Sequence, residues 1–359
     1  MVQERSATDM KVTLIKGPCL PGKCGVGDYT SRLAEVLQQV GARVTVLDSG
    51  DWGVMRLASL TRLVRATEPD ILHLQYPTAG FGYKLGPQGL AAVVPSVVTI
   101  HEASKAHVLR KLSLYPFALR ARHIIFTNDE ERAFALRWAP WIGENSSVVP
   151  IGSNVPGVTG VDHREIREIV HFGLVMPRKG LEDVVELASL FKINHQELRV
   201  RVVGNCRPKD AAYGAEFRRI SEGLPLSWEQ ELSEAMVGER LAGACIAYLP
   251  FPDGASERRA TLKAALVNGM AVVTTRNSDT PVDLEPVVKF CSSPLEAFAT
   301  IQELVANPKQ AEELGNRARR YARRYSWDMI AQSHISIYRR LCRQTLGRTE
   351  QKVEDQRIA

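Results

Sequence analysis

The chain of 359 residues has the length of about two domains and the composition of a globular protein, with 45% hydrophobic and 24% charged residues. Lysine and arginine total 46 against 40 acidic residues, and the net charge of +6 is spread along the chain. This mild excess favours anionic ligands such as phosphates but lacks the concentrated basic patch of a nucleic-acid-binding protein, so no nucleic-acid partner is expected.

The first half of the chain alternates short apolar runs with amphipathic helical stretches. Helices are predicted at 30–40, 52–67 and 130–138, and strands are predicted to begin at Lys11, Arg43, Ile71, Ser96, His123 and Ser147. This alternation predicts a parallel sheet with helices on both faces.

The second half repeats the pattern after a loop rich in glycine and proline at 151–160. Helices are predicted at 181–191, 260–268, 294–306 and 309–324, and strands are predicted to begin at Ile169, Leu198, Ala244, Ala271 and Val287. We therefore predict an α/β protein with two Rossmann-like domains, 1–155 and 156–325, facing a central cleft, with ligands at the carboxyl ends of the strands. The polar segment 346–359 is expected to form a disordered tail.

The first candidate site is a glycine loop that begins at Gly22 and enters the first helix. Gly25 and Gly27 let backbone N–H groups approach a ligand, and a helix N-terminus favours an anion. A tight turn with a helix cap from Asp28 or Thr30 explains the same residues without a ligand.

The second candidate is His101, at the end of the strand that begins at Ser96. Its imidazole is expected at the carboxyl edge of the sheet, where it can hydrogen-bond a sugar hydroxyl or a phosphate. Alternatively, His101 caps the following helix. The adjacent Glu102 is either an acid or base or a charge at a helix N-terminus.

The third candidate is the turn between Gly173 and Gly180, where Arg178 and Lys179 place positive charge beside a helix start. Such charges can stabilise a departing diphosphate, although a solvated basic turn has the same composition.

The fourth candidate is the loop 250–261, where a strand ends and a helix begins. Backbone amides at this helix start suit a phosphate chain, together with Arg258, Arg259 and Thr261. Glu257 is a candidate partner for ribose hydroxyls or for the donor sugar. A helix capped by Ser256 with exposed charges is the alternative.

These four motifs, in this order, resemble glycosyltransferases of the GT-B fold, and in particular family 4 of the retaining enzymes that use nucleotide sugars. The resemblance covers roughly residues 11–341. It is carried by the segments 22–37, 72–77, 98–102, 147–154, 172–180, 249–256 and 268–275. The segment 325–338 resembles the terminal helix of the family, which crosses back to the N-terminal domain, so a helix is expected at 326–345.

The resemblance implies that the N-terminal domain binds the acceptor and the C-terminal domain a nucleoside-diphosphate sugar. His101 matches the family histidine beside the donor sugar, and Lys179 matches the lysine that contacts the diphosphate; with Glu257 they are the expected catalytic residues. The donor is expected to contact Gly25, Gly27, Gly173, Arg178, Lys179, Ser256, Arg258, Arg259 and Thr261, and the acceptor side to include Asp28, Tyr29, Gln75 and Glu102.

The implied reaction is the transfer of a hexosyl or related unit with retention, in which the acceptor hydroxyl gives its proton to the leaving phosphate. Neither a metal nor a cofactor is expected, because cationic side chains and helix dipoles stabilise the diphosphate. The acceptor is a glycan, a lipid-linked sugar or a small molecule.

The chain departs from the family pattern at three positions. Leu174 stands where the family commonly has arginine, and Ser256 and Ala264 stand where it has two glutamates. Glu257 is the candidate replacement for the first glutamate, and Arg178, Arg258 or Arg259 for the lost arginine charge. Two alternatives follow: a catalytically degenerate protein that binds nucleotide sugars, or a nucleotide-sugar epimerase that uses Glu102 and Glu257.

The six cysteines, at 19, 24, 206, 245, 291 and 342, form neither a paired framework nor the spacing of a zinc site. The first residues lack the apolar core of a signal peptide, and the longest apolar runs are shorter than the ~20 residues that cross a bilayer. The segment 104–122 mixes basic and apolar side chains, as half-buried surface commonly does, and is also compatible with contact to an anionic membrane. The expected location is the cytoplasm, either free or at the inner face of the membrane.

Overall fold

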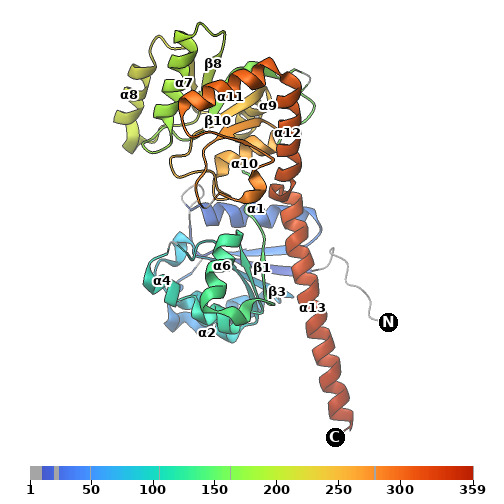
Figure 1. Cartoon of the computed structure of the whole chain (residues 1–359). Coiled ribbons are helices and arrows are strands. Elements are labelled where there is room, and N and C mark those ends of the chain that lie inside the picture. The colour runs from blue at the N-terminus through green and yellow to red at the C-terminus, as the bar shows by residue number, and fades with distance from the viewer. Residues whose placement is uncertain are drawn as a thin grey trace. The chain divides into compact units, whose positions relative to one another are not determined.

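The computed structural model describes residues 10–19, 24–48, 50–104, 106–161, 163–278 and 280–358, with side chains up to Thr345. The chain divides into two compact units (Figure 1). Unit 1 comprises Met1–Ile151 and Trp327–Ala359, and unit 2 comprises Gly152–Ser326. These divisions fall beside the domain boundaries expected at 155 and 325.

In the described part of unit 1, six parallel strands form one sheet. They are β1 (Lys11–Ile15), β2 (Arg43–Leu47), β3 (Ile71–Tyr76), β4 (Ser96–Ile100), β5 (His123–Phe126) and β6 (Ser146–Val148). Their spatial order is β2-β1-β3-β4-β5-β6. The chain leaves β1 toward β2 and returns to the other side of β1 as β3, so the topological switch point lies between β1 and β3.

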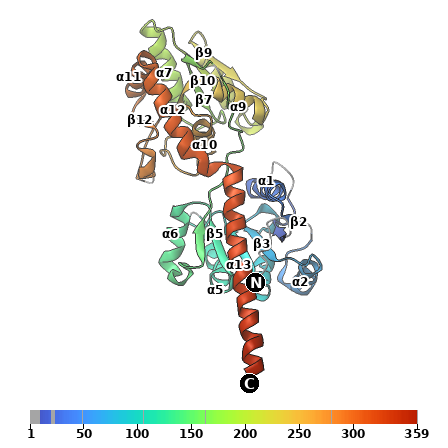
Figure 2. The same ribbon diagram turned by 90° about the vertical axis from the view of Figure 1, so that its right-hand side faces the viewer.

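Helices cover both faces of this sheet, as the strand–helix alternation predicts. One face packs on α1 (Gly25–Gln39) and on α13 (Trp327–Ile358), which lies across the sheet of unit 1 (Figure 2). The other face packs on α2 (Leu57–Ala66), α3 (Gly86–Val93), α5 (Tyr115–Arg120) and α6 (Asp129–Trp138). Because both faces are covered, every residue of β3 and β4 is buried.

Unit 2 repeats this architecture, again with six parallel strands among the residues described. They are β7 (Glu165–Phe172), β8 (Arg199–Val203), β9 (Leu226–Glu229), β10 (Ala244–Leu249), β11 (Ala271–Thr274) and β12 (Lys289–Phe290). Their order, β12-β11-β10-β7-β8-β9, puts the switch point between β7 and β10. The predicted class, α/β with two Rossmann-like sheets, is confirmed.

The core of unit 2 lies on both faces of its sheet. One face packs on α7 (Leu181–Ile193), α8 (Ala211–Ser221) and α11 (Pro294–Ala306). The opposite face packs on α9 (Glu234–Ala242) and α10 (Ala260–Val267), and α12 (Pro308–Ala322) contributes to both clusters. The strand β9 was not predicted from the sequence, because its four residues form an edge strand with only intermediate or exposed positions.

The C-terminal segment differs from the expectation of a helix at 326–345 and a disordered tail. The helix α13 runs from Trp327 to Ile358. The segment 346–358 is rich in Glu, Gln, Lys and Arg, which have high helix propensity, and this accounts for the longer helix. Within the described ranges, no helix combines the length and hydrophobicity that a bilayer crossing requires.

Candidate functional site

The switch point of unit 1 is built by close contact between the loops that follow β1 and β3. A Cβ added at Gly80 would lie 2.3 Å from the Pro18 carbonyl oxygen. The thiol of Cys24 accepts hydrogen bonds at 3.4 Å from the backbone N–H groups of Ala79 and Gly27. Cys24 thereby caps α1, whereas the alternative without a ligand had Asp28 or Thr30 as the cap.

The two glycines predicted to face a ligand are in different environments. A Cβ at Gly27 would meet the Cys19 sulfur at 2.4 Å, so a side chain at this position would have to displace Cys19. A Cβ at exposed Gly25, the first residue of α1, would meet no atom of the described residues within 4 Å. The half-buried Asp28 lies in the first turn of this helix. Gly22 lies outside the described residues.

His101 follows β4 directly and is anchored by hydrogen bonds of its backbone and its ring. Its backbone N–H donates to the carbonyl of Tyr76 at 2.8 Å, and its Nε2 lies 2.8 Å from Oε1 of Gln75. Its Nδ1 is buried and has no partner among the described residues. Burial lowers the pKa of His101 to about 3, with a smaller contribution from His334, so the ring is neutral at physiological pH. The following helix, α4 (Val108–Leu112), is capped by His107, so His101 is not its cap.

The acceptor-side residues expected around His101 separate into buried and exposed ones. Gln75 is wholly buried, and its side chain supports His101. Tyr29 is also buried, with its ring edge-on to His101 at a centroid distance of 5.0 Å. Glu102 is exposed. The loop that carries it is held by Glu131, a buried residue that the sequence analysis missed, which accepts from the backbone N–H of Ala103 at 2.7 Å.

At the switch point of unit 2, the structure brings together the third and fourth motifs of the sequence. Gly180 has φ +74°, and a Cβ there would lie 1.8 Å from the Pro250 carbonyl oxygen. A Cβ at the buried Gly173 would lie 3.7 Å from both Cγ2 of Thr261 and Nε2 of His171. The turn before α7 and the loop before α10 are therefore in contact at the carboxyl ends of β7 and β10.

Cationic side chains gather at this point. Lys179 is half-buried and makes no hydrogen bond or ion pair with any described residue. Its pKa is lowered by burial and further by the nearby guanidinium groups of Arg259 and Arg207. Arg259 pairs with Asp253 and lies 4.8 Å from the centre of the Phe251 ring. Because Lys179 is not neutralised, this cluster is suited to bind an anion.

Arg207 was not singled out by the sequence analysis. It follows β8, donates to Asp210 at 2.7 Å and lies 3.0 Å from the sulfur of Met176 in the turn before α7. Its position could have indicated a site residue, because Arg207 follows β8, a neighbour of β7 in the same sheet. Arg178, in contrast, is exposed and has a left-handed backbone with φ +62°.

Glu257 is engaged with residues of its own unit. Its carboxylate accepts from the hydroxyl of Tyr325 at 3.3 Å and lies 4.0 Å from Nη1 of Arg324. Lys263, which the sequence analysis missed, is buried with its ammonium 4.8 Å from the centre of the Tyr325 ring. Burial lowers the pKa of Lys263 to about 8, opposed by the charge of Glu257. Ser256, Arg258 and Thr261 are half-buried beside this group.

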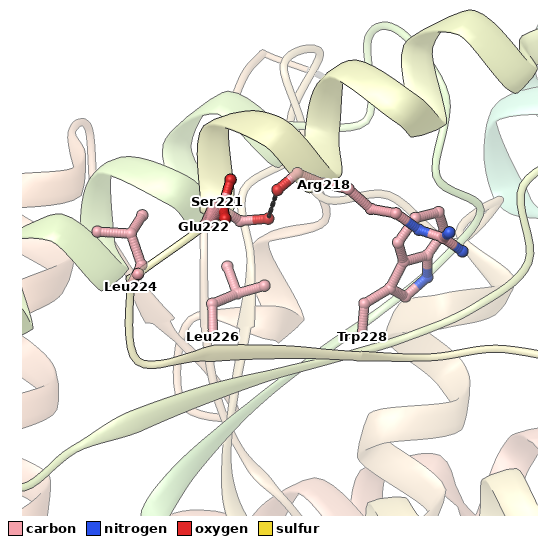
Figure 3. A pocket seen from close by; sticks show the side chains of 7 residues that line it. Arg218, Ser221, Glu222, Leu224, Leu226 and Trp228 are labelled. Atoms are coloured by element: carbon pink, nitrogen blue, oxygen red, sulfur yellow. Dashed lines mark hydrogen bonds between the residues drawn. The ribbon is translucent and has the colours of Figure 1, made fainter.

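Unit 2 also carries a surface pocket between the end of α8 and β9 (Figure 3). The pocket has a volume of about 370 Å³ and is lined by Arg218, Ser221, Glu222, Gly223, Leu224, Leu226 and Trp228. None of the predicted site residues lines it, so it is separate from the candidate site at the switch point. Within the described ranges, no three His, Cys, Asp or Glu side chains converge as metal ligands.

No protein-family model and no curated protein sequence matches the chain. Solved structures do. HepE from Anabaena, in complex with UDP and glucose, matches with a TM-score of 0.59 at 14% identity, over 91% of this chain and 98% of that chain. A glycosyltransferase from Rickettsia africae matches with a TM-score of 0.66 at 12% identity, over 93% and 98% of the two chains.

A third match is sucrose-phosphate synthase from Thermosynechococcus elongatus, with a TM-score of 0.63 at 16% identity over 92% and 99% of the two chains. Each similarity spans both units of this chain. The chain therefore has the fold of these glycosyltransferases, the two-domain GT-B fold.

Proposed function

We propose that this protein is a glycosyltransferase that moves a sugar from a nucleoside-diphosphate sugar to an acceptor hydroxyl. The observation that carries the proposal is the cationic cluster at the switch point of unit 2, in which Lys179 has no partner among the described residues. A diphosphate is the ligand that such a cluster suits. HepE, which shares the fold, binds UDP together with glucose.

In this proposal, unit 2 holds the donor. The backbone N–H groups at the start of α7 face a phosphate. Those at the start of α10, which follows the neighbouring loop, do the same. Lys179 and Arg259 supply the charge that stabilises the diphosphate as it leaves. Phosphate binding at Lys179 breaks no existing ion pair, so little of the binding free energy is lost in rearrangement.

We assign acceptor binding to unit 1 and propose transfer with retention and without a metal. The bond between the anomeric carbon and the diphosphate oxygen breaks, and a bond from the acceptor oxygen to the same face of that carbon forms. The acceptor proton goes to the leaving phosphate. His101 acts as a neutral hydrogen-bonding group for a donor-sugar hydroxyl, because its low pKa excludes the imidazolium form near neutral pH.

One observation favours the second candidate, a degenerate protein that binds nucleotide sugars without turnover. Glu257, the candidate replacement for a family glutamate, is occupied by Tyr325 and lies near Arg324. Ala264, at the position of the other glutamate, is buried and apolar. Binding and turnover therefore need separate measurements.

The test combines titration calorimetry with UDP, GDP and ADP and a turnover assay with the corresponding sugars and an acceptor panel. Lys179→Ala is expected to weaken binding of the preferred diphosphate by about tenfold to a hundredfold, the effect of one charged hydrogen bond. Lys309→Ala, which removes an exposed lysine from the start of α12, is the matched control and should bind normally.

The outcomes separate the two candidates. Transfer that resists EDTA supports the metal-independent reaction, and analysis of the anomeric configuration of the product decides retention. Binding without transfer to any acceptor would favour the degenerate protein. Equal affinity of Lys179→Ala and the wild type would remove the diphosphate site from this cluster.

We further propose that unit 1 contacts an anionic membrane that carries the acceptor lipid. The apolar side chains of Leu109 and Leu112 in α4 and of Leu119 in α5 are 66%, 57% and 65% exposed, and Arg110 and Lys111 lie among them. Such a mixture favours a negatively charged lipid surface. Arg122 does not contribute, because it bonds to Leu341 and Thr345 of α13, and Lys105 lies outside the described residues.

The membrane proposal is tested by flotation with vesicles of phosphatidylcholine alone or mixed with phosphatidylglycerol. Binding is expected only to the anionic vesicles and should fall in the double variant Leu109→Ser/Leu112→Ser. Leu295→Ser, which removes a leucine of unit 2 that is 63% exposed, is the control. Absence of binding to anionic vesicles would overturn the proposal.

A further inference from the structure

A chain of hydrogen bonds runs from His101 into the interior of unit 1. Nε2 of His101 lies 2.8 Å from Oε1 of Gln75, and the Gln75 amide nitrogen lies 3.2 Å from Nε2 of His73. The same His73 nitrogen lies 2.7 Å from the Thr99 hydroxyl, and its Nδ1 lies 2.6 Å from the Tyr338 hydroxyl of α13. Gln75, His73, Thr99 and Tyr338 are all wholly buried.

The amide of Gln75 fixes the direction of the protons in this chain, because its nitrogen only donates and its oxygen only accepts. With Nε2 of His73 accepting from the Gln75 amide nitrogen and from the Thr99 hydroxyl, the proton of that ring lies on Nδ1, which donates to Tyr338. Oε1 of Gln75 can only accept, so Nε2 of His101 carries the proton of its ring. Nδ1 of His101 is left with a lone pair.

The surroundings keep both rings neutral. Burial lowers the pKa of His73 well below its usual value, and that of His101 to about 3. Tyr29 of α1, His73 of β3 and His334 of α13 lie near His101, and none of them supplies a negative charge near neutral pH. The carboxylate of the adjacent Glu102 is exposed to solvent. An amide at position 75 preserves this neutrality, whereas a carboxylate there would favour the imidazolium form.

We propose that Gln75 is a positioning residue that holds His101 as the neutral tautomer protonated at Nε2, with Nδ1 as the hydrogen-bond acceptor for a hydroxyl group. The assignment of that hydroxyl to the donor sugar rests on the proposed function. The tautomer itself does not, since it follows from the contacts within unit 1. Through His73 and Tyr338, the packing of α13 helps to orient His101.

The tautomer is measured by ¹⁵N NMR of the full chain labelled at its histidines, with the His101 signals identified by their loss in His101→Asn. A protonated, pyrrole-type Nε2 and an unprotonated, pyridine-type Nδ1 are expected in the wild type. Loss of this single tautomer is expected in Gln75→Leu. The opposite tautomer in the wild type would overturn the proposal, because it would require the Gln75 amide to be reversed.

Activity gives the second readout. Gln75→Leu is expected to lower kcat roughly tenfold to a hundredfold, the effect of a misplaced catalytic contact, with a small change in KM. Gln75→Glu is expected to raise the pKa of His101 and to shift the acid limb of the pH–rate profile to higher pH. An unchanged profile in Gln75→Glu would contradict the positioning role.

The matched control is Gln88→Leu. Gln88 is also a buried glutamine of unit 1, and its amide donates to the Tyr76 hydroxyl at 3.0 Å. This variant should lose stability without altering the His101 tautomer or the pH profile.

The expected tautomer in a protein that transfers no sugar would support the role of Gln75 and refute the proposed function. Sugar transfer by a protein whose His101 has the opposite tautomer would support the proposed function and refute the role of Gln75.

Discussion

Arg178 and Lys179 are adjacent in the sequence, but the fold gives them different environments. Arg178 is exposed and its φ of +62° lies in the left-handed region, which costs a residue with a Cβ about 1–2 kcal/mol. Lys179 is half-buried among other cations. The sequence assigned both residues to the anion site, and in the proposed function Lys179 is the side chain that binds.

We therefore expect Arg178→Gly to raise the free energy of unfolding by up to about 1 kcal/mol, because glycine adopts the left-handed conformation freely, at some entropic cost. Its affinity for the nucleoside diphosphate should stay within about threefold of the wild type, since an exposed charge contributes little. Urea unfolding and calorimetry measure the two effects.

Arg178→Ala is the control, because it removes the charge and keeps the backbone strain. It should show no gain in stability. A loss of diphosphate affinity in Arg178→Ala as large as that in Lys179→Ala would contradict this division of roles.

At the residue scale, the sequence could predict positions that follow directly from strand ends and turns. His101 and Lys179 stand at such positions, and both lie at the carboxyl edge of a sheet. The support of His101 by Gln75 and Tyr338 could not be predicted, because it depends on the packing of α13 against residues more than 200 positions away. The burial of Lys263 was missed for a different reason, because a lysine in a helix is usually exposed.

At the scale of elements, the turn that joins β7 to α7 determines the shape of the candidate donor site. Gly180→Ala would place a Cβ 1.8 Å from the Pro250 carbonyl oxygen and would also force alanine into φ +74°. We expect this substitution to lower the free energy of unfolding by roughly 2–4 kcal/mol and to weaken diphosphate binding, because the two loops must separate. Urea unfolding and calorimetry again provide the measurements.

Gly160→Ala is the matched control, because Gly160 has nearly the same φ, +76°, and no atom of the described residues lies within 4 Å of an added Cβ. This variant should lose only the backbone contribution to the free energy of unfolding, about 1–2 kcal/mol, and should bind the diphosphate normally. Equal losses in the two variants would mean that the contact with Pro250 does not hold the loops together.

The periodic alternation of strands and helices was sufficient to predict both sheets, because parallel sheets covered on both faces are built from continuous apolar runs. The short edge strand β9 and several helices, among them α3, α8 and α9, were not predicted. β9 contains only one charged residue but is only partly buried, so its pattern does not stand out from a loop. The contact between the loops at Gly180 and Pro250 also needed the structure, since 70 residues separate them.

At the scale of the whole molecule, buried neutral histidines are unevenly distributed between the two units. Among the described residues, unit 1 buries His73, His123 and His334 and half-buries His101, and unit 2 buries His171. Burial is the main cause of the low pKa in each of them. Acid should therefore destabilise unit 1 more than unit 2.

The direction in which stability changes with pH follows from proton binding by the unfolded chain. Its histidines take up protons below pH 6.5, whereas those of the folded units stay neutral down to a pKa of about 4 in His171 and His334. Stability is therefore complete above pH 6.5 and is lost as the pH falls toward 4, at up to about 1.4 kcal/mol per pH unit for each histidine. Between pH 7 and pH 5, hydrogen exchange corrected for its intrinsic pH dependence should accelerate more in the sheet of unit 1 than in that of unit 2. His334→Gln should reduce the difference, and equal acceleration in both units would show that the buried histidines do not control acid stability.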